Sequence, residues 1–334
     1  MDKILLDHGS GGKISHSLIS DIILPAFNNT ILSRLGDGAL LDLGESRIAF
    51  STDTFTVDPL FFPGGDIGRL AINGTVNDIA MCGATPLFMS VGFLIEEGFP
   101  MEDMENILAS MRSSAQEAEV QIVTGDTKVV PRGAADRFFV NTTGVGLVPE
   151  GIEISPHKAT PGDRIILSGS IGDHGITVLL QREAMTLDAP IRSDTAPLNH
   201  LVNKMINISP DIHVLRDPTR GGLGTALNEI ARSSGVGIRI RQNSIPVRPE
   251  VESVCELMGF DPLYIANEGK LIAIIPENEA DNILSAMRRD RYAREAVIIG
   301  EVVSENPGMV LMETKIGGVR IVDMLTGEQL PRIC

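Results

Sequence analysis

The stretch that decides the fold spans residues 66–84 and reads DIGRLAINGTVNDIAMCGA. Apolar residues recur at helical spacing from Ile67 to Ala80, which predicts a helix that ends near Cys82 and Gly83. Small residues keep this helix slim, so that another backbone can approach it closely. These small residues are Ala71, Gly74, Ala80, Gly83 and Ala84. Cys82 is expected to be a small buried residue rather than a reactive one.

Alternating strands and helices are predicted on both sides of this helix. Strands are expected at residues 3–6, 48–53, 87–95, 120–124 and 138–148, and an amphipathic helix at 100–118. A second unit of the same kind opens with a strand at 163–169 and a helix at 175–182. Further segments of this unit are a helix that starts in 217–222, a strand at 271–275, a helix at 277–288 and strands at 297–303, 309–312 and 319–322. This order predicts an α/β layer sandwich.

Prolines 149, 156 and 161 interrupt a polar connection between the two units. We therefore expect an N-terminal domain over residues 1–150, a C-terminal α/β domain over 157–322 and a flexible tail over 323–334. A chain of 334 residues is long enough for two buried cores.

Composition excludes several classes of protein. With 28 Lys and Arg against 44 Asp and Glu, the formal charge is −16, which disfavours binding to nucleic-acid backbones. The three cysteines are far apart and lack the spacing of a zinc site or of a disulfide framework. No secretory leader and no apolar run of membrane-spanning length is apparent. We expect a cytoplasmic protein without a membrane partner.

Four aspartates of the first unit have contexts typical of a ligand site. Asp37 lies between two glycines, Asp53 and Asp126 follow apolar strands, and Asp78 lies in the slim helix. Carboxylates together with phosphates are the usual ligands of Mg²⁺, so these four are the candidate metal ligands. Lys128 offers a positive charge to the same phosphates. The alternative is four unrelated turn aspartates and a solvated lysine.

Two further candidate functional segments lie near the ends of the sequence. The stretch 8–13, HGSGGK, is rich in glycine and its amides are able to fold over a phosphate, although a mobile loop is an equal alternative. The last four residues, PRIC, place a thiol at Cys334. Taken alone, this end is more typical of a frayed terminus than of a functional group.

Five motifs occur in the order seen in one known superfamily. They are GDGA at 36–39, STD at 51–53, NDIAMCGA at 77–84, GDTK at 125–128 and DPTRGG at 217–222. The chain thereby resembles the ATP-dependent superfamily of aminoimidazole ribonucleotide synthetase, selenophosphate synthetase and thiamine-monophosphate kinase. The resemblance spans nearly the whole chain.

The resemblance implies a two-domain architecture like that of aminoimidazole ribonucleotide synthetase. It also implies a homodimer whose N-terminal domains pair through a shared β-barrel, and a cleft that binds ATP and Mg²⁺. The residues that it assigns to this cleft are Asp37, Thr52, Asp53, Asn77, Asp78, Gly125, Asp126, Lys128, Asp217 and Thr219.

The terminal PRIC, together with DPTRGG and with NEG at 267–269, resembles the HypE family of carbamoyl dehydratases from hydrogenase maturation. That family receives a carbamoyl group on the terminal sulfur from the carbamoyltransferase HypF. It uses ATP to dehydrate the group to a thiocyanate, and passes the cyanide to the HypC–HypD iron scaffold. The resemblance implies that Cys334 carries the group and that Lys128 assists phosphoryl transfer. Glu268 is the leading candidate for the base, and a turn carboxylate is the alternative.

Two other functions stay open at the level of the sequence. A small-molecule kinase or ligase of the same superfamily would use the same ATP site on a free substrate. A scaffold whose tail docks into a partner would leave Cys334 chemically unchanged. The mass of Cys334 after incubation with ATP and a carbamoyltransferase distinguishes these two functions from the carbamoyl dehydratase.

Overall fold

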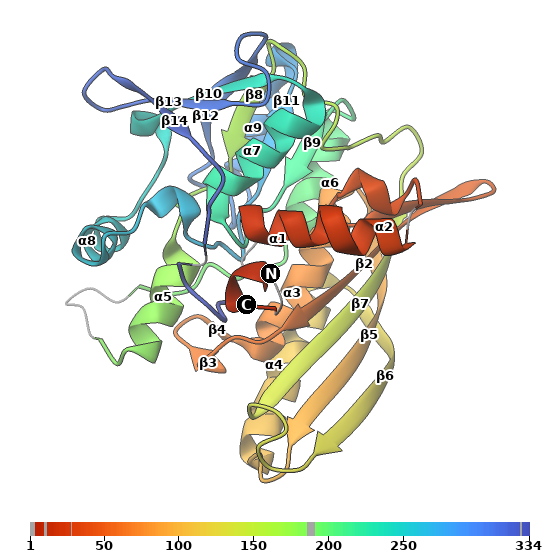
Figure 1. The fold of residues 1–334 in the computed structure, drawn as a ribbon. Helices are drawn as coiled ribbons and strands as arrows, with labels where there is room; N and C mark the ends of the chain where they lie inside the picture. The colour runs from red at the N-terminus through yellow and green to blue at the C-terminus, as the bar shows by residue number, and fades with distance from the viewer. Residues whose placement is uncertain (1–3, 10–11, 28, 186–190, 328) are drawn as a thin grey trace.

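A computed structural model of the chain describes residues 4–9, 12–27, 29–185, 191–327 and 329–334. It contains two main units, each built on one β-sheet, which lie one above the other in Figure 1. The predicted α/β class is therefore confirmed. In the described part of the chain, no helix is both long and apolar enough to cross a bilayer.

The first unit is a five-stranded sheet of order β1-β2-β7-β5-β6. Its strands are β1 (Ala39–Leu43), β2 (Ser46–Phe55), β5 (Thr85–Glu96), β6 (Gln121–Val130) and β7 (Phe138–Val148). A small hairpin precedes its main helix, with β3 (Phe61–Phe62) and β4 (Gly65–Asp66). The two helices that cover one face are α3 (Ile67–Met81) and α4 (Met101–Ala118).

Helix α3 is the predicted slim helix, and the structure shows why its neighbours are small. Asp66 caps it by accepting hydrogen bonds from the amides of Gly68 and Arg69. Strand β7 passes close beneath it, and a Cβ added at Gly146 would lie 2.4 Å from Ile79 Cγ2. Helix α3 thus packs directly on the sheet backbone, and Cys82 at its end is buried.

The second unit is a seven-stranded sheet of order β14-β13-β10-β12-β8-β11-β9. Its strands are β8 (Arg164–Leu167), β9 (Val214–Arg216), β10 (Gly237–Arg241), β11 (Ile272–Ile275), β12 (Val297–Val303), β13 (Val310–Glu313) and β14 (Val319–Val322). Its helices are α5 (Asp173–Arg182), α6 (Asn199–Ile208), α7 (Gly222–Ser234), α8 (Pro249–Met258) and α9 (Glu277–Met287). One buried cluster joins the units, because Ile79 of α3 belongs with Leu201 of α6 and Ile283 of α9.

The remaining elements are short. At the N-terminus lie η1 (Leu6–Gly9), α1 (Lys13–Leu18), η2 (Ile19–Ile23), α2 (Leu24–Phe27) and η3 (Leu32–Arg34), and in the second unit η4 (Gln242–Ser244) and η5 (Pro262–Tyr264). The strand predicted at 3–6 is wrong, since Leu6 begins a 3-10 helix and residues 1–3 lie outside the described residues. Residues 10 and 11 of the glycine-rich stretch also lie outside them, so its expected phosphate loop is not described.

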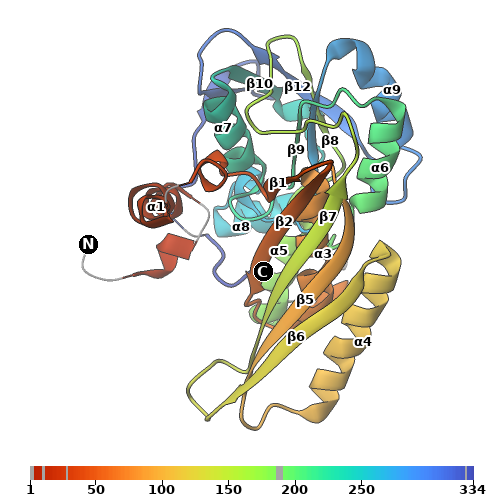
Figure 2. The same cartoon turned by 90° about the vertical axis from the view of Figure 1, so that its right-hand side faces the viewer.

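One face of the first sheet has no helix over it (Figure 2). Strand β6 forms one edge of this sheet, opposite β1, and most of its residues are exposed. Large apolar side chains are exposed on the sheet: Phe50, Phe88, Leu94, Ile122, Val123, Val129 and Leu147. An exposed apolar sheet with an open edge is typical of a surface that pairs with another chain.

Candidate active site

A cavity of about 210 Å³ lies where the two units meet. Strand β2, helix α3, the loop after β9, the Glu268 segment and the last residue all contribute to its lining. Its lining includes Asp37, Thr52, Asp53, Asp78, Asp217, Thr219, Arg220, Glu268 and Cys334. Most of the predicted site residues are thereby brought together from segments far apart in the sequence.

Three carboxylates form the centre of this cavity. Asp37 precedes β1, Asp78 lies on α3 and Asp217 follows β9. One oxygen of each lies within 4.8 Å of the other two. Asp53 of β2 lines the same cavity and shares a hydrogen bond with Asp78. Oxygen ligands at this spacing suit a divalent cation that also binds phosphate.

The electrostatics of the cluster show a deficit of positive charge. Burial, together with the neighbouring acids, raises the pKa of Asp37 to about 8 in spite of Arg216. Burial raises the pKa of Asp217 to about 6, and that of Asp78 well above its ordinary value. Closely packed carboxyls with raised pKa values are those that a bound cation would stabilise in the ionised form. The residues present therefore fit Mg²⁺.

Two further residues hold the cluster in place. Arg216 bridges Asp37 at 2.5 Å and Glu229 of α7 at 2.7 Å. Ser51 donates its hydroxyl to Asp78 Oδ2 at 2.6 Å, and also lies 3.1 Å from the carbonyl of Asp37. Neither was among the predicted site residues. Ser51 opens the STD motif and Arg216 directly precedes DPTRGG, and this adjacency was the available signal.

Glu268 and Cys334 meet at the same cavity. Burial, followed by repulsion from Asp217 and Asp194, raises the pKa of Glu268 well above its ordinary value. Its Oε1 is buried and makes no hydrogen bond with any residue that the structure describes. An unpartnered buried acceptor of this kind favours a ligand that brings an N–H or O–H donor.

The tail that carries Cys334 is docked rather than extended into solvent. Thr56 donates its amide to the Cys334 carbonyl at 2.9 Å, and Asp58 donates its amide to the Arg332 carbonyl at 3.1 Å. Ile333 is 4% exposed and belongs to the core of the first unit. Residues 332–334 thus lie against the segment that follows β2, while the flexibility expected of the tail at 323–334 stays a prediction.

Three predicted residues lie elsewhere within one chain. Asp126 and Lys128 form an exposed ion pair of 3.4 Å on β6, and Gly125 lies beside them. Strands β2 and β6 are three strand spacings apart, about 14 Å. Asp126 therefore cannot share a metal ion with Asp53 of its own chain. It also lies inside β6 rather than at a strand end, because pairing with β5 continues to Val130.

Asn77 lies between the two units and is not part of the cavity lining. Its Nδ2 donates to the carbonyl of Ala196 at 3.1 Å and lies 3.4 Å from that of Glu268, and its Oδ1 accepts the amide of Leu198 at 2.8 Å. The side chain is thus fully used between the two units. In this position Asn77 supports the Glu268 segment, and its expected contact with the nucleotide stays a prediction.

The remaining predicted residues are placed at the rim of the cavity. Thr52 and Thr219 line it, and Thr52 donates its hydroxyl to the carbonyl of Thr142. Arg220 also lines it and donates to the carbonyl of Gly9 at 3.3 Å, which brings the glycine-rich N-terminal stretch to this edge. A cation at this rim suits a phosphate chain.

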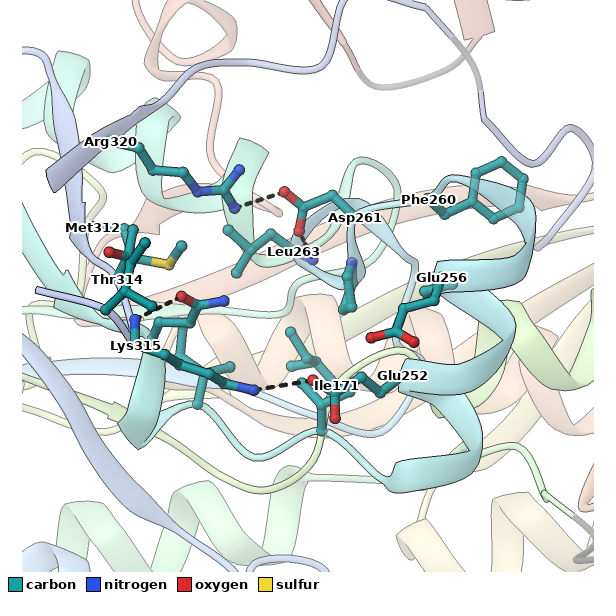
Figure 3. Close-up of a pocket in the computed structure, with 16 residues that line it drawn as sticks. Ile171, Glu252, Glu256, Phe260, Asp261, Leu263, Met312, Thr314, Lys315 and Arg320 are labelled. Carbon is teal, nitrogen blue, oxygen red and sulfur yellow. Dashed lines mark hydrogen bonds and ion pairs between the residues drawn. The ribbon is translucent and has the colours of Figure 1, made fainter. Parts of the chain in front are cut away.

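A larger cavity of about 630 Å³ lies in the second unit and is lined by residues of α8, η5 and the strands β13 and β14 (Figure 3). Four of its charged groups form two pairs, with Arg320 bonded to Asp261 at 2.6 Å and Lys315 to Glu252 at 3.0 Å. It lacks the carboxylate cluster, so size alone does not identify the active site.

Comparison with known proteins agrees with this geometry. The family model of the AIR synthase related protein N-terminal domain matches residues 35–148, and that of the C-terminal domain matches 160–312. The carbamoyl dehydratase HypE of Azotobacter vinelandii is 53% identical over 327 residues, which covers 98% of this chain and 96% of the relative. The chain belongs to the HypE family.

Solved structures of HypE proteins have the same fold. A HypE in complex with ATP is 52% identical, with a TM-score of 0.84 over 99% of this chain and all of that one. A HypE in a HypE–HypF complex is 48% identical, with a TM-score of 0.88 over 92% of this chain and all of that one. Within the superfamily, these findings favour the HypE branch over the kinase and ligase branches.

The raised pKa values predict how the affinity of this carboxylate cluster for added Mg²⁺ would depend on pH. A metal ion binds the ionised carboxylates, so it must displace protons from Asp217 below pH 6 and from Asp37 below pH 8. We expect Mg²⁺ affinity, measured by calorimetry, to rise from pH 6 to pH 8 by about tenfold per pH unit for each proton released. Equal affinity at both pH values would contradict this electrostatic account.

The same shifts act on stability in the opposite direction when no metal is added. Their contribution favours the folded protein at low pH and is lost as pH rises through about 6 and then about 8. The gain in melting temperature on adding Mg²⁺ should therefore be larger at pH 8 than at pH 6. Asp217→Asn, which removes one of the three candidate ligands, should reduce that gain.

Proposed function

We propose that this protein is an ATP-dependent carbamoyl dehydratase that acts on a carbamoyl group carried by its own Cys334. The product is a thiocyanate, the source of the cyanide ligand of the iron centre in NiFe hydrogenases. The observation that carries the proposal is the shared cavity. Cys334 and Glu268 line the same space as the carboxylate cluster of Asp37, Asp78 and Asp217.

The chemistry balances as a phosphorylation followed by an elimination. The carbamoyl oxygen on Cys334 attacks the γ-phosphorus of ATP and releases ADP, which turns a poor leaving group into phosphate. Nitrogen gives up its two protons over the two steps. The C–O bond then breaks, phosphate leaves with the bonding electrons, and a carbon–nitrogen triple bond remains on sulfur.

Each demand of this chemistry has a residue at the cavity. Asp37, Asp78 and Asp217 would hold Mg²⁺, which neutralises charge on the transferring phosphoryl group when bound. Arg220 at the rim offers a second positive charge to the phosphates. Glu268 presents the unpartnered Oε1 to the N–H groups of the carbamoyl nitrogen, and a raised pKa makes it a stronger base once ionised.

The proposal is tested by supplying ATP to the carbamoylated protein and following phosphate release. Phosphate is expected to appear once for each carbamoyl group consumed, and the uncarbamoylated protein is expected to release far less. Equal release with and without the carbamoyl group would favour a kinase or ATPase that acts on another substrate. If the tail serves only as a docking peptide, the protein should release no phosphate, whether or not it carries the carbamoyl group.

Partners follow from the same proposal. HypF is the expected carbamoyltransferase, in agreement with the HypE–HypF complex of a relative 48% identical to this chain. The HypC–HypD complex is the expected acceptor of the cyanide, and the cytoplasm the expected compartment. The docked end of the chain must leave its binding position to meet either partner, so Cys334 must occupy two locations in turn.

A homodimer is part of the proposal. The uncovered face of the first sheet and the open edge of β6 supply the apolar surface, and Asp126 and Lys128 lie on that edge. We infer that a second copy places them near the phosphates, since they lie about 14 Å from Asp53 of their own chain.

Val129→Asp on β6, where Val129 is 66% exposed, should convert the dimer to a monomer. Light scattering measures the mass in solution. Leu257→Asp on α8, where Leu257 is 73% exposed on the second unit, is the matched control and should leave the mass unchanged. An unaltered dimer in the Val129 variant would place the interface on another surface.

A further inference from the structure

Helix α5 presents one face to the docked tail. His174, Val178 and Arg182 are spaced four residues apart and so lie on the same side of the helix. His174 Nε2 lies 2.7 Å from the Ile333 carbonyl, and Arg182 donates to the Arg332 carbonyl at 2.8 Å. Val178 belongs to the same buried cluster as Ile333. The second unit thus contacts the backbone of the two residues that precede Cys334.

The hydrogen-bond network fixes which nitrogen of His174 carries the proton. The Ile333 carbonyl can only accept, so Nε2 carries the hydrogen that is donated to it. In the neutral ring Nδ1 is then an acceptor, and Ser193 Oγ donates to it at 2.8 Å while accepting the amide of Thr195 at 3.2 Å. Burial lowers the pKa of His174 and keeps the ring neutral. The imidazole is thus a fixed, uncharged donor to the tail.

Asp194, the residue after Ser193, binds the backbone of Glu268, the proposed base. Asp194 Oδ1 accepts the amide of Glu268 at 3.1 Å, and Oδ2 pairs with Lys270 at 3.0 Å. The two segments are in close contact, since a Cβ added at Gly269 would lie 1.8 Å from the Asp194 carbonyl oxygen. Residues 193 and 194 therefore contact the tail through His174 on one side and the Glu268 segment on the other.

We propose that His174, Ser193 and Asp194 are positioning residues that couple docking of the tail to placement of Glu268. The inference rests on the proposed function, because it concerns the same carbamoyl group and the same base. When the tail is seated, the His174 bond holds Ser193, and Ser193 holds the backbone from which Asp194 orients Glu268. When the tail leaves, this support is released and Glu268 loses its fixed position.

His174→Phe and His174→Gln separate the hydrogen bond from the bulk of the ring. Phenylalanine fills the space without a donor, whereas glutamine retains an N–H that reaches the Ile333 carbonyl. Loss of the bond should raise the alkylation rate of the Cys334 thiol about tenfold, as expected for one buried hydrogen bond. In pre-carbamoylated His174→Phe, dehydration should slow by about the same factor while ATP affinity is retained. Glutamine should restore both rates toward the wild type.

Cys82 and Cys255 are internal controls for alkylation, because both are buried. If alkylation became equally faster at all three thiols, the variant would be loosened as a whole, and a local effect of the His174 bond on the tail would be ruled out. Wild-type rates of Cys334 alkylation and of dehydration in His174→Phe would also overturn the proposal.

The coupling itself is tested by combining His174→Phe with Asp194→Asn. Non-additive effects on dehydration are expected, and additive effects would overturn the coupling. If the carbamoylated wild type never loses water, the proposed function fails instead, while Cys334 alkylation still tests the docking bond by itself.

Discussion

Cys334→Ser is expected to abolish formation of the cyano group completely. The proposed reaction needs a sulfur that accepts the carbamoyl group and later holds the thiocyanate, and a serine hydroxyl is a far weaker nucleophile than a thiol. The fold should not change, because Cys334 is only partly buried and its carbonyl makes the bonds to Thr56. The measurement is the intact mass of the variant after incubation with HypF, a carbamoyl donor and Mg-ATP.

Cys255→Ser is the matched control for this experiment. Cys255 lies on α8, is 1% exposed and lines the second cavity rather than the first. This variant should lose some stability, because it buries a hydroxyl, yet it should still acquire the carbamoyl and cyano groups. A cyano group on the Cys334→Ser protein would locate the carrier elsewhere and remove the tail from the chemistry.

Glu268→Gln should retain ATP binding, accumulate the carbamoylated form and slow dehydration by about 10²- to 10⁴-fold. Glutamine keeps the size and the polarity of the side chain but cannot take a proton from nitrogen. In the wild type, a base whose pKa is raised by burial should give a dehydration rate that increases with pH as Glu268 ionises. The glutamine variant should lack that increase.

The control for Glu268 is Glu256→Gln, an exposed glutamate of α8 at the second cavity. Its dehydration rate and pH profile should match those of the wild type. A normal rate in Glu268→Gln would assign the base to another residue, whereas loss of ATP binding would assign Glu268 to nucleotide binding.

The strongly periodic parts of the fold were predictable from the sequence. Helix α4 has a clear apolar stripe and α3 has apolar residues at helical spacing. Strand β5 is largely apolar and β7 is rich in β-branched and aromatic residues, so the positions of these four elements were predicted to within a few residues. Helix α6 and strands β9 and β10 were missed. Strand β9 has only three residues, whereas α6 has an amphipathic pattern and β10 alternates apolar and basic residues, so the signal for these two was present in the sequence. Asp53 and Asp126 were assigned to strand ends, but backbone pairing extends both strands beyond them.

The residues of the site likewise include some that the sequence predicted and some that it did not. Asp37, Asp78 and Asp217 were found from their motifs, and the structure brings them together as one cluster. The contributions of Arg216 and His174 depend on contacts between distant segments, which no local pattern encodes. The seat of the tail also depends on such a contact. Ile333 buries its side chain among residues of the first unit, and one isoleucine near the end of a chain does not reveal that partner surface.

Intact mass of the wild-type protein, followed through two incubations, tests the central claim most directly. After HypF and the carbamoyl donor, the protein should gain the mass of one carbamoyl group, located at Cys334 by peptide mapping. After Mg-ATP, it should lose the mass of one water from that residue, with release of one phosphate. A carbamoyl group that stays unchanged at Cys334 while ATP is consumed would contradict the account.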